Sequence, residues 1–217
     1  MKTPIPTLSL LLSSLVLTGC ASKPAQPDWQ GNAHSALDSF TSAYLKGNTR
    51  ASAQDFARAK SEISSTGRAD LLARAELVRC AVRVASLEFD ECAGYQPLAT
   101  RASKTERSYA AYLTSRWQDI EVALLPVQHR AMLASSGTAV STIDDPLARL
   151  VAAGVLLQSG RLTPADMDTA TETASAQGWR RPLLAWLGVQ LRSAQDAHDT
   201  DGVARLQRRI DLVVPAL

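Results

Sequence analysis

The chain has 217 residues, of which 46% are hydrophobic and 20% charged, and its formal net charge is +2. This length suits one domain of ordinary size, and the composition excludes a polytopic membrane protein, an acidic disordered tail and a strongly basic nucleic-acid-binding protein. Alanine occurs 35 times and arginine 18 times, whereas aromatic residues make up only 5%. Because this mixture favours helices and leaves little for a large sheet, we expect an all-α protein.

The first 20 residues have the pattern of a secretion signal. Lys2 supplies one positive charge, residues 8–17 form an apolar run, and small residues precede Cys20. The run is too short to cross about 30 Å of hydrocarbon as a helix. We therefore expect a cleaved signal peptide rather than a transmembrane segment.

The sequence Leu-Thr-Gly-Cys at residues 17–20 resembles the lipobox of bacterial lipoproteins. The resemblance implies that residues 1–19 form a lipoprotein signal peptide and that Cys20 is acylated, with fatty acids such as palmitate. Several acyl chains would anchor the protein stably to the lipid bilayer, because each buried methylene contributes about 0.8 kcal/mol. Ala21 resembles the residue found in lipoproteins of the outer membrane, so the expected location is the cell envelope, facing the periplasm. The alternative is an ordinary secretory signal with an incidental cysteine.

Residues 20–30 are predicted to be the lipidated cysteine and a linker, because residues 21–28 contain two prolines and no periodic apolar residues. Trp29 stands at the end of this linker, where it either covers the core or lies at the lipid interface. Residues 31–217 are predicted to form a single α-helical domain. Residues 135–142 are rich in Gly, Ser and Thr and are the candidate position for an internal break in this domain.

Cys80 and Cys92 remain once Cys20 is acylated, and such a pair forms a disulfide readily outside the cytosol. Cys80 falls in a helical pattern that should stop near Ser86, and the loop that follows is long enough to return Cys92 to it. A reactive thiol pair is the competing interpretation, but the pair lacks C-x-x-C spacing and a nearby histidine. We therefore predict a disulfide.

Apolar residues recur at intervals of three and four from residue 31 onward, which predicts antiparallel helical hairpins. The first predicted helix ends at Gly47, and the second begins with a box-like segment at residues 52–55 and ends before Gly67. A third helix ends near Ser86. A capping box at residues 103–106 opens a fourth helix, which is predicted to continue through residue 120 toward a proline at 126.

The last third of the chain carries the clearest helix boundaries. Asp145 and Thr163 each precede a proline, as expected for an N-cap residue followed by the first helical turn. Gly160 and Gly178 are placed where the corresponding helices should end. A further helix pair is predicted to begin near Pro182.

Successive hairpins in this region begin about 36 residues apart, close to the 34-residue unit of tetratricopeptide repeats. The similarity to the first helix of such a repeat is carried by Leu150, Ala153, Gly154 and Leu157. A weaker similarity is carried by Leu37, Phe40, Tyr44 and Ala53. The resemblance implies tetratricopeptide-like hairpins with small residues at close crossings. The middle of the chain is irregular and lacks the closing proline, so an irregular helical bundle is the alternative.

No motif for catalysis was found. The sequence lacks a glycine-rich phosphate loop, a serine-nucleophile motif and a zinc pattern, and we predict no catalytic, cofactor-binding or metal-ligating residues. The three histidines are expected at the surface or at helix ends: His34, His129 and His198. Two carboxylate pairs could in principle serve a glycosidase, at Asp90-Glu91 and Asp144-Asp145, but Asp145 already has a capping role.

Five arginines could form a cationic patch that meets anionic lipid or a carboxylate-bearing partner, or could simply be a solvated helix face. They are Arg180, Arg181, Arg205, Arg208 and Arg209. Nucleic acid is not an expected partner, because a lipidated envelope protein does not meet the genome.

The hypothesis that follows is a non-enzymatic envelope lipoprotein, anchored through acylated Cys20, that acts as an interaction or assembly adaptor for an unknown envelope protein. In outline it resembles pilotins and the lipoprotein partners of barrel assembly. This resemblance concerns the architecture only and assigns no functional residues. The alternatives are a cell-wall-related enzyme, a small-ligand-binding lipoprotein and a passive structural lipoprotein. A deep polar cleft with several carboxylates would favour an enzyme, whereas a smooth apolar groove would favour partner binding.

Overall fold

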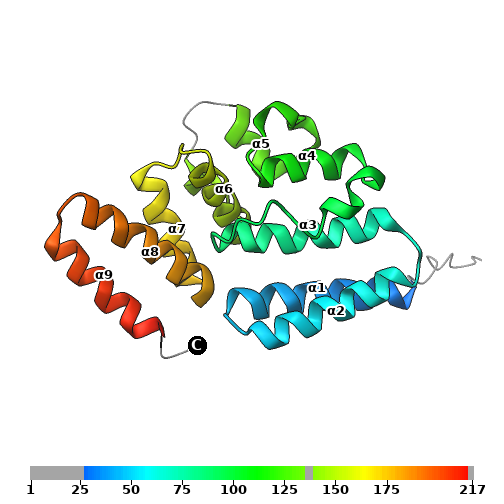
Figure 1. Cartoon of the computed structure of the whole chain (residues 1–217), viewed down its shortest axis with the longest axis horizontal. Helices are drawn as coiled ribbons and strands as arrows, with labels where there is room; N and C mark the ends of the chain where they lie inside the picture. The colour runs from blue at the N-terminus through cyan, green and yellow to red at the C-terminus, as the bar shows by residue number, and fades with distance from the viewer. Residues whose placement is uncertain (1–26, 135–138, 215–217) are drawn as a thin grey trace, which may run out of the picture.

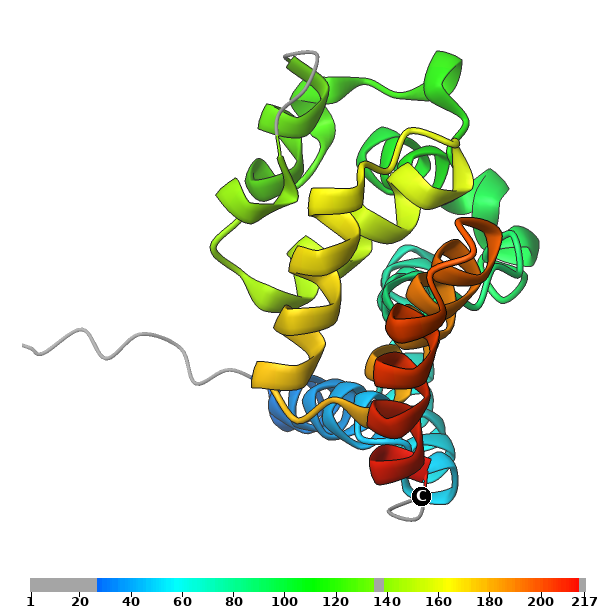
Figure 2. The same ribbon diagram turned by 90° about the vertical axis from the view of Figure 1, so that its left-hand side faces the viewer.

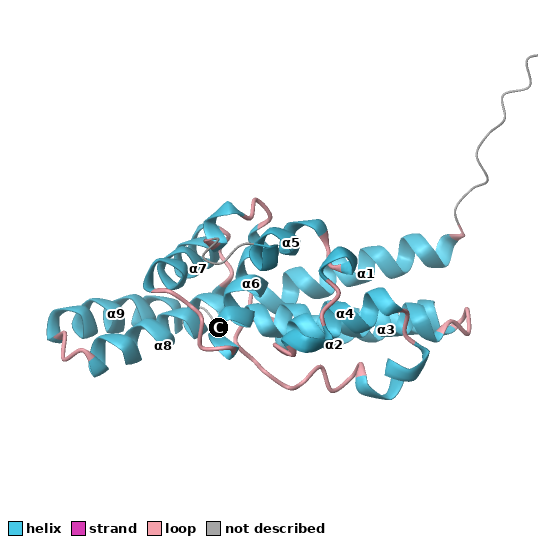
Figure 3. Cartoon of the chain, turned by 90° about the horizontal axis from the view of Figure 1, so that it is seen from above, coloured by secondary structure: helices cyan, strands magenta, loops and turns pink. Residues whose placement is uncertain are grey.

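The computed structural model of the chain describes residues 27–134 and 139–214, and every regular element in these ranges is a helix (Figure 1). Figure 3, coloured by secondary structure, shows no strand in the described part of the chain. The prediction of an all-α protein is therefore confirmed. Among the described helices, none is long and apolar enough to span a membrane.

The N-terminal hairpin consists of α1 (Asp28–Leu45) and α2 (Thr49–Ser64). Helix α1 begins within the predicted linker, directly after Pro27, so the prediction that the linker reaches residue 30 is wrong. The Asp28 carboxylate in the first turn favours this earlier start, because it faces the positive end of the helix dipole. Trp29 is partly buried on this helix.

Helix α2 also begins earlier than predicted. The Asn48 side chain accepts a hydrogen bond from the Ala51 backbone amide at 3.1 Å and forms the N-cap. The Ser52 hydroxyl instead donates to the Thr49 carbonyl within the first turn, so the box-like start predicted at residues 52–55 is wrong. Asparagine is among the best N-cap residues, which explains why it outcompetes the later serine.

Helix α3 (Ala69–Ala85) ends at the predicted place, with Ser86 as its C-cap. It runs through the middle of the molecule, with the α1–α2 hairpin on one side and α4 (Lys104–Leu113) and α5 (Val127–Ala134) on the other (Figure 1). A 3-10 helix, η1 (Gln96–Arg101), precedes α4. Helix α3 is thus the element on which both sides of the fold pack.

Helix α4 confirms the predicted capping box and contradicts the predicted length. The Ser103 side chain accepts from the Glu106 amide, and the Glu106 carboxylate accepts from the Ser103 amide at 2.9 Å. The helix then ends at Leu113, because Ser115 adopts a φ of 54° and its hydroxyl donates to the Val155 carbonyl at 3.1 Å. Two short 3-10 helices, η2 (Trp117–Asp119) and η3 (Val122–Leu124), replace the predicted continuation toward Pro126.

Four helices form the C-terminal third: α6 (Pro146–Gln158), α7 (Pro164–Ala176), α8 (Arg180–Asp196) and α9 (Thr200–Val213). The predicted caps are confirmed, since Asp145 accepts from the Ala148 amide at 2.6 Å and Thr163 forms a capping box with Asp166. Gly160 and Gly178 adopt the left-handed φ of 66° and 63° that ends a helix. Figure 2 looks onto this end of the molecule, where α9 packs along α8.

The hairpin spacing is regular only in this third. Helices α6 and α8 begin about one 34-residue tetratricopeptide unit apart. In the middle of the chain, α3 is not followed by a helix of similar length that could complete a hairpin with it, and it packs on α6 instead. The described fold is therefore a set of helical hairpins without a regular repeat through the middle of the chain.

The largest buried cluster joins residues on both sides of the suggested internal break, including Cys80 on α3 and Leu150 on α6. Residues 135–138 of that break lie outside the described ranges. Immediately after them, Val140 in the 3-10 helix η4 (Val140–Thr142) is fully buried, and its amide donates to Asp166 at 3.0 Å. Gly154 lies at the crossing of α6 with α3, where a Cβ atom would stand 2.4 Å from the Val84 carbonyl oxygen. The prediction of small residues at close crossings is met here.

Candidate functional site

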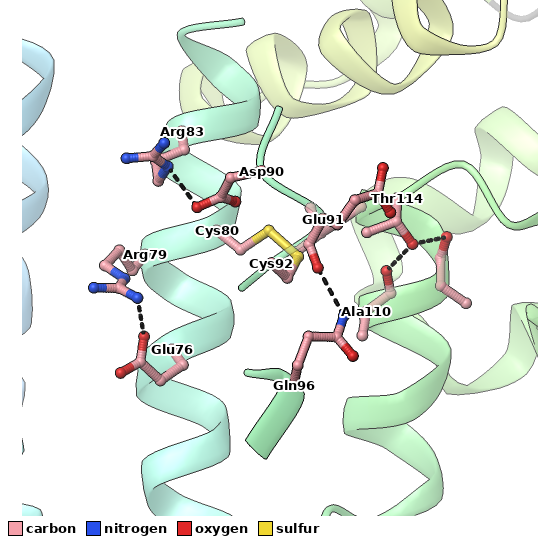
Figure 4. The surroundings of a disulfide bond; sticks show 12 residues. Glu76, Arg79, Cys80, Arg83, Asp90, Glu91, Cys92, Gln96, Ala110 and Thr114 are labelled. Atoms are coloured by element: carbon pink, nitrogen blue, oxygen red, sulfur yellow. Dashed lines mark hydrogen bonds and ion pairs between the residues drawn. A yellow bond between two sulfur atoms is a disulfide. The ribbon is translucent and has the colours of Figure 1, made fainter. Parts of the chain in front are cut away.

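The predicted disulfide is present. The sulfur atoms of Cys80 on α3 and Cys92 in the following loop are 1.97 Å apart (Figure 4). Two ion pairs flank it, Arg79 with Glu76 at 2.8 Å and Arg83 with Asp90 at 3.1 Å. The bridge therefore holds the loop after α3 against the central helix, close to η1 and α4.

The predicted lipidation site, Cys20, lies outside the described residues. It stands seven residues before Pro27, the first residue that the structure describes.

An apolar groove lies between α3 and α4 and has a volume of about 410 Å³. We call it the α3–α4 groove. Its apolar lining comes from Leu77, Val78, Tyr109, Leu124, Leu125 and Pro126, and Thr105, Arg74 and Glu106 complete it. Apolar clefts of this size with few polar groups are the usual form of a ligand or partner site.

One ion pair marks the edge of this groove. Glu106 is 4% exposed, and its carboxylate accepts from the Arg74 guanidinium at 2.9 Å and from the Ser103 amide at 2.9 Å. Burial acts to raise the pKa of Glu106, but the hydrogen bonds from Ser103 and Arg74 outweigh burial and hold that pKa below its ordinary value. The carboxylate therefore remains ionised and fully engaged, while the Arg74 side chain is two-thirds exposed.

An aromatic cluster lies behind the groove. His129 of α5 is 1% exposed, and its Nδ1 atom is 3.1 Å from the Tyr112 hydroxyl. The Tyr109 and His129 rings stack with centroids 6.0 Å apart. Burial lowers the pKa of His129 to about 4, against a smaller opposing effect of Asp145. His129 does lie at a helix end, in the first turn of α5, but the expectation of a surface position is wrong: α5 packs this ring against α4, which no local pattern in the sequence shows.

The other two predicted histidine positions are solvent-exposed. His34 faces Asp38 across one helical turn at 3.5 Å. His198 occupies the turn between α8 and α9. Among the described residues, no group of three or more His, Cys, Asp and Glu side chains is placed to hold a metal ion.

In each of the two carboxylate pairs, one member is engaged by a partner and the other is exposed. Asp145 caps α6, as predicted, and Asp144 is exposed beside it. Asp90 pairs with Arg83 beside the disulfide, while Glu91 is exposed.

Four of the five arginines predicted as a cationic patch have partners of their own. Arg181 is largely buried between α8 and α1, and Arg180 donates to the Lys46 carbonyl. On α9, Arg209 pairs with Glu172 at 3.0 Å and Arg205 with Asp199 at 3.8 Å. For Arg205 and Arg209, the interpretation as a partly neutralised helix face is the better one.

Sequence reasoning missed the α3–α4 groove. Its lining comes from two helices and from the 3-10 segment that ends at Leu124, which the sequence had predicted to be a continuation of α4. The nearest available signal was Pro126, a proline expected to kink or split the helix, which lies in the groove wall. Comparisons of the chain with family models, curated proteins and solved structures found no match.

Proposed function

We propose that this protein is a membrane-anchored lipoprotein of the bacterial cell envelope that acts as a non-enzymatic protein-interaction or assembly adaptor in the periplasm. The observation that supports the adaptor role best is the α3–α4 groove, whose lining is almost entirely apolar. Its single carboxylate, Glu106, is already saturated by Arg74 and Ser103 and is not free for acid or base chemistry. An apolar groove between helices is a common docking place for the apolar side chains of a partner segment.

The anchor proposal rests on the lipobox-like residues 17–20 and on the distance from Cys20 to the folded domain. Helix α1 begins at Asp28, so the tether from Cys20 is about eight residues long. Even when fully extended, such a segment reaches only about 25–30 Å. The domain would therefore work close to the bilayer surface, and its partner would be a membrane-associated envelope protein.

The disulfide supports an extracytoplasmic location, because such bonds persist in oxidising compartments such as the periplasm. It also ties the loop after α3 to the helix that carries Leu77 and Val78 of the groove.

The test is photo-crosslinking in living cells, with the protein at its native level. A photoreactive residue replaces Thr105, an exposed residue of the groove, and a matched control carries it at Thr200, an exposed threonine on α9. We expect one envelope protein to be captured at position 105 and not at position 200. We also expect capture to be lost in Leu124→Arg, which puts a charge into the groove, and to survive in Leu212→Arg, which adds the same charge to an exposed site on α9.

The anchor has its own measurement. Mass spectrometry of the mature N-terminus should find an acylated Cys20, and Cys20→Ser should release the protein from the membrane fraction. An unmodified Cys20, or a mature chain that begins elsewhere, contradicts the anchor. No capture at position 105, with cell-wall fragments co-purifying instead, contradicts the adaptor and favours the alternative of a wall-related enzyme or small-ligand-binding lipoprotein.

A further inference from the structure

A second cleft, separate from the α3–α4 groove, lies on the other side of α4. It is bounded by η1, α4 and η2 and has a volume of about 360 Å³. In contrast to the groove, much of its lining is polar and charged, with Lys104, Arg107 and Arg116 as its basic residues. We call it the η1–α4 cleft.

Tyr95 lines this cleft and has a buried hydroxyl without a partner in the part of the chain that the structure describes. The residue is 3% exposed, yet its hydroxyl has no hydrogen-bond partner among the described residues. An unpaired buried hydroxyl is costly, and native proteins rarely leave one without a reason. A phenol hydroxyl is a good donor to an anion, and here burial raises the pKa of Tyr95, so the proton stays on the oxygen at neutral pH.

The positive charges that line the cleft are only partly neutralised. Arg107 donates to the Ala102 carbonyl, which fixes its position without cancelling its charge. Arg116 has only a loose pair with Asp119 at 3.9 Å. Lys104 has no ion pair within the described ranges of the chain.

Two carboxylates, Asp119 and Glu121, also line the cleft. With three basic and two acidic side chains, the cleft has a surplus of one positive charge. This balance fits a singly charged oxyanion and disfavours a doubly charged phosphate. Arginine suits a carboxylate particularly well, because its guanidinium can donate two parallel hydrogen bonds to the two oxygens.

We propose that the η1–α4 cleft binds the carboxylate of a small molecule or of a peptide C-terminus, held by Arg107 and Arg116 with the Tyr95 hydroxyl as a further donor. This proposal does not depend on the adaptor function, because it concerns a different cavity with different chemistry. A small-molecule acid and a peptide C-terminus both present a carboxylate, and the probes of the experiment distinguish the two ligands.

The experiment titrates the protein as the cell produces it, in detergent micelles, by isothermal calorimetry or chemical-shift changes. The probes are acetate, the capped dipeptide N-acetyl-alanyl-alanine, its C-terminal amide, and inorganic phosphate. We expect a carboxylate probe to bind and the amide not to bind. Tighter binding of the dipeptide than of acetate would identify a peptide end, and equal binding a free acid. Binding of the amide as tight as that of the acid, tighter binding of phosphate, or no binding of any carboxylate would overturn the proposal.

Three variants test the residues. Tyr95→Phe and Arg116→Gln should each weaken carboxylate binding about tenfold, as expected for one lost hydrogen bond to a charged group. Arg58→Gln is the matched control, because Arg58 has the same i,i+3 pairing with an aspartate, Asp55, at a similar exposure on α2. Thermal unfolding without ligand separates binding from folding: Tyr95→Phe should fold at least as stably as the parent, since it removes an unpaired hydroxyl. Unchanged binding in both cleft variants would overturn the assignment.

Discussion

The guanidinium of Arg181 lies over the ring of Tyr44, 4.3 Å from its centroid, and its Nε atom donates to the Tyr44 carbonyl at 2.9 Å. The same side chain reaches Thr49 at 2.8 Å and Glu88 at 3.3 Å. One residue at the start of α8 thereby ties together the N-terminal hairpin and the loop that carries Cys92. This contact closes the C-terminal helices back onto α1.

Replacing this arginine should loosen that closure. We expect Arg181→Lys to lower the free energy of unfolding by about 1–3 kcal/mol, because an ammonium cannot make the planar contact and the several directed hydrogen bonds together. Arg180→Lys is the control, since Arg180 makes one hydrogen bond to the Lys46 carbonyl and should cost less than about 1 kcal/mol. Urea unfolding followed by circular dichroism measures both. Equal effects of the two substitutions would contradict the role given to Arg181.

The crossing of α3 and α6 should not tolerate a methyl group. Gly154→Ala places a Cβ atom 2.4 Å from the Val84 carbonyl oxygen, a backbone atom that cannot move aside, and we expect a loss of about 1–3 kcal/mol. Gly188→Ala in the interior of α8 is the matched control, because the nearest group that its Cβ atom would meet is the Arg192 side chain at 3.9 Å. There alanine should be neutral or stabilise the helix by up to about 1 kcal/mol. The melting temperature of Gly154→Ala should therefore fall while that of Gly188→Ala stays the same or rises, and a destabilised Gly188→Ala would argue against the packing explanation.

The disulfide should contribute substantially to stability. Cys80 and Cys92 are 12 residues apart, and closing a loop of this size contributes about 3 kcal/mol in the chain-entropy account. We expect Cys80→Ser, and the double variant with Cys92→Ser, to melt at lower temperature and to accumulate at lower abundance in cells. Peptide mapping without reductant should join the two cysteine peptides in the parent protein. Two free thiols in protein isolated from cells without reductant would show that the bond does not form in the cell.

His129 should make the fold sensitive to mild acid. Its pKa is about 4 in the folded protein and about 6.5 in an unfolded chain, so between these values the unfolded chain binds more protons. Stability therefore falls as the pH drops from about 6.5 to 4, by up to about 3 kcal/mol, and is unaffected by this group above pH 7. His129→Gln should flatten the pH dependence between 4.5 and 6.5, whereas His34→Gln, at an exposed site, should leave it unchanged. The slope is the readout, because the variant also changes the contact with Tyr112. An unchanged slope in His129→Gln would mean that the ring does not titrate as described.

The local features of the sequence determined much of the secondary structure. Prolines after Asp145 and Thr163, the pair Ser103 and Glu106, and glycines at 160 and 178 act within a few residues of where they stand. The disulfide partners could likewise be predicted, because the chain between them is short and leaves few arrangements. The starts of α1 and α2 were misplaced by a few residues for local reasons, but the larger errors arose where a distant partner decided the outcome. Helix α4 stops at Leu113 because Ser115 bonds to Val155, forty residues away.

The candidate sites also depend on contacts between residues that lie far apart in the chain. The sequence by itself determined that the chain is helical, where most helices begin and end, and which two cysteines pair, because these depend on backbone caps, periodicity and short loops. Only the tertiary structure decided that His129 is buried, that Arg181 locks onto Tyr44, and that one face of α4 borders an apolar groove while the other borders a charged cleft. Those features join residues from helices far apart in the chain, and the packing that brings them together is set by shape and burial over the whole core rather than by any local pattern.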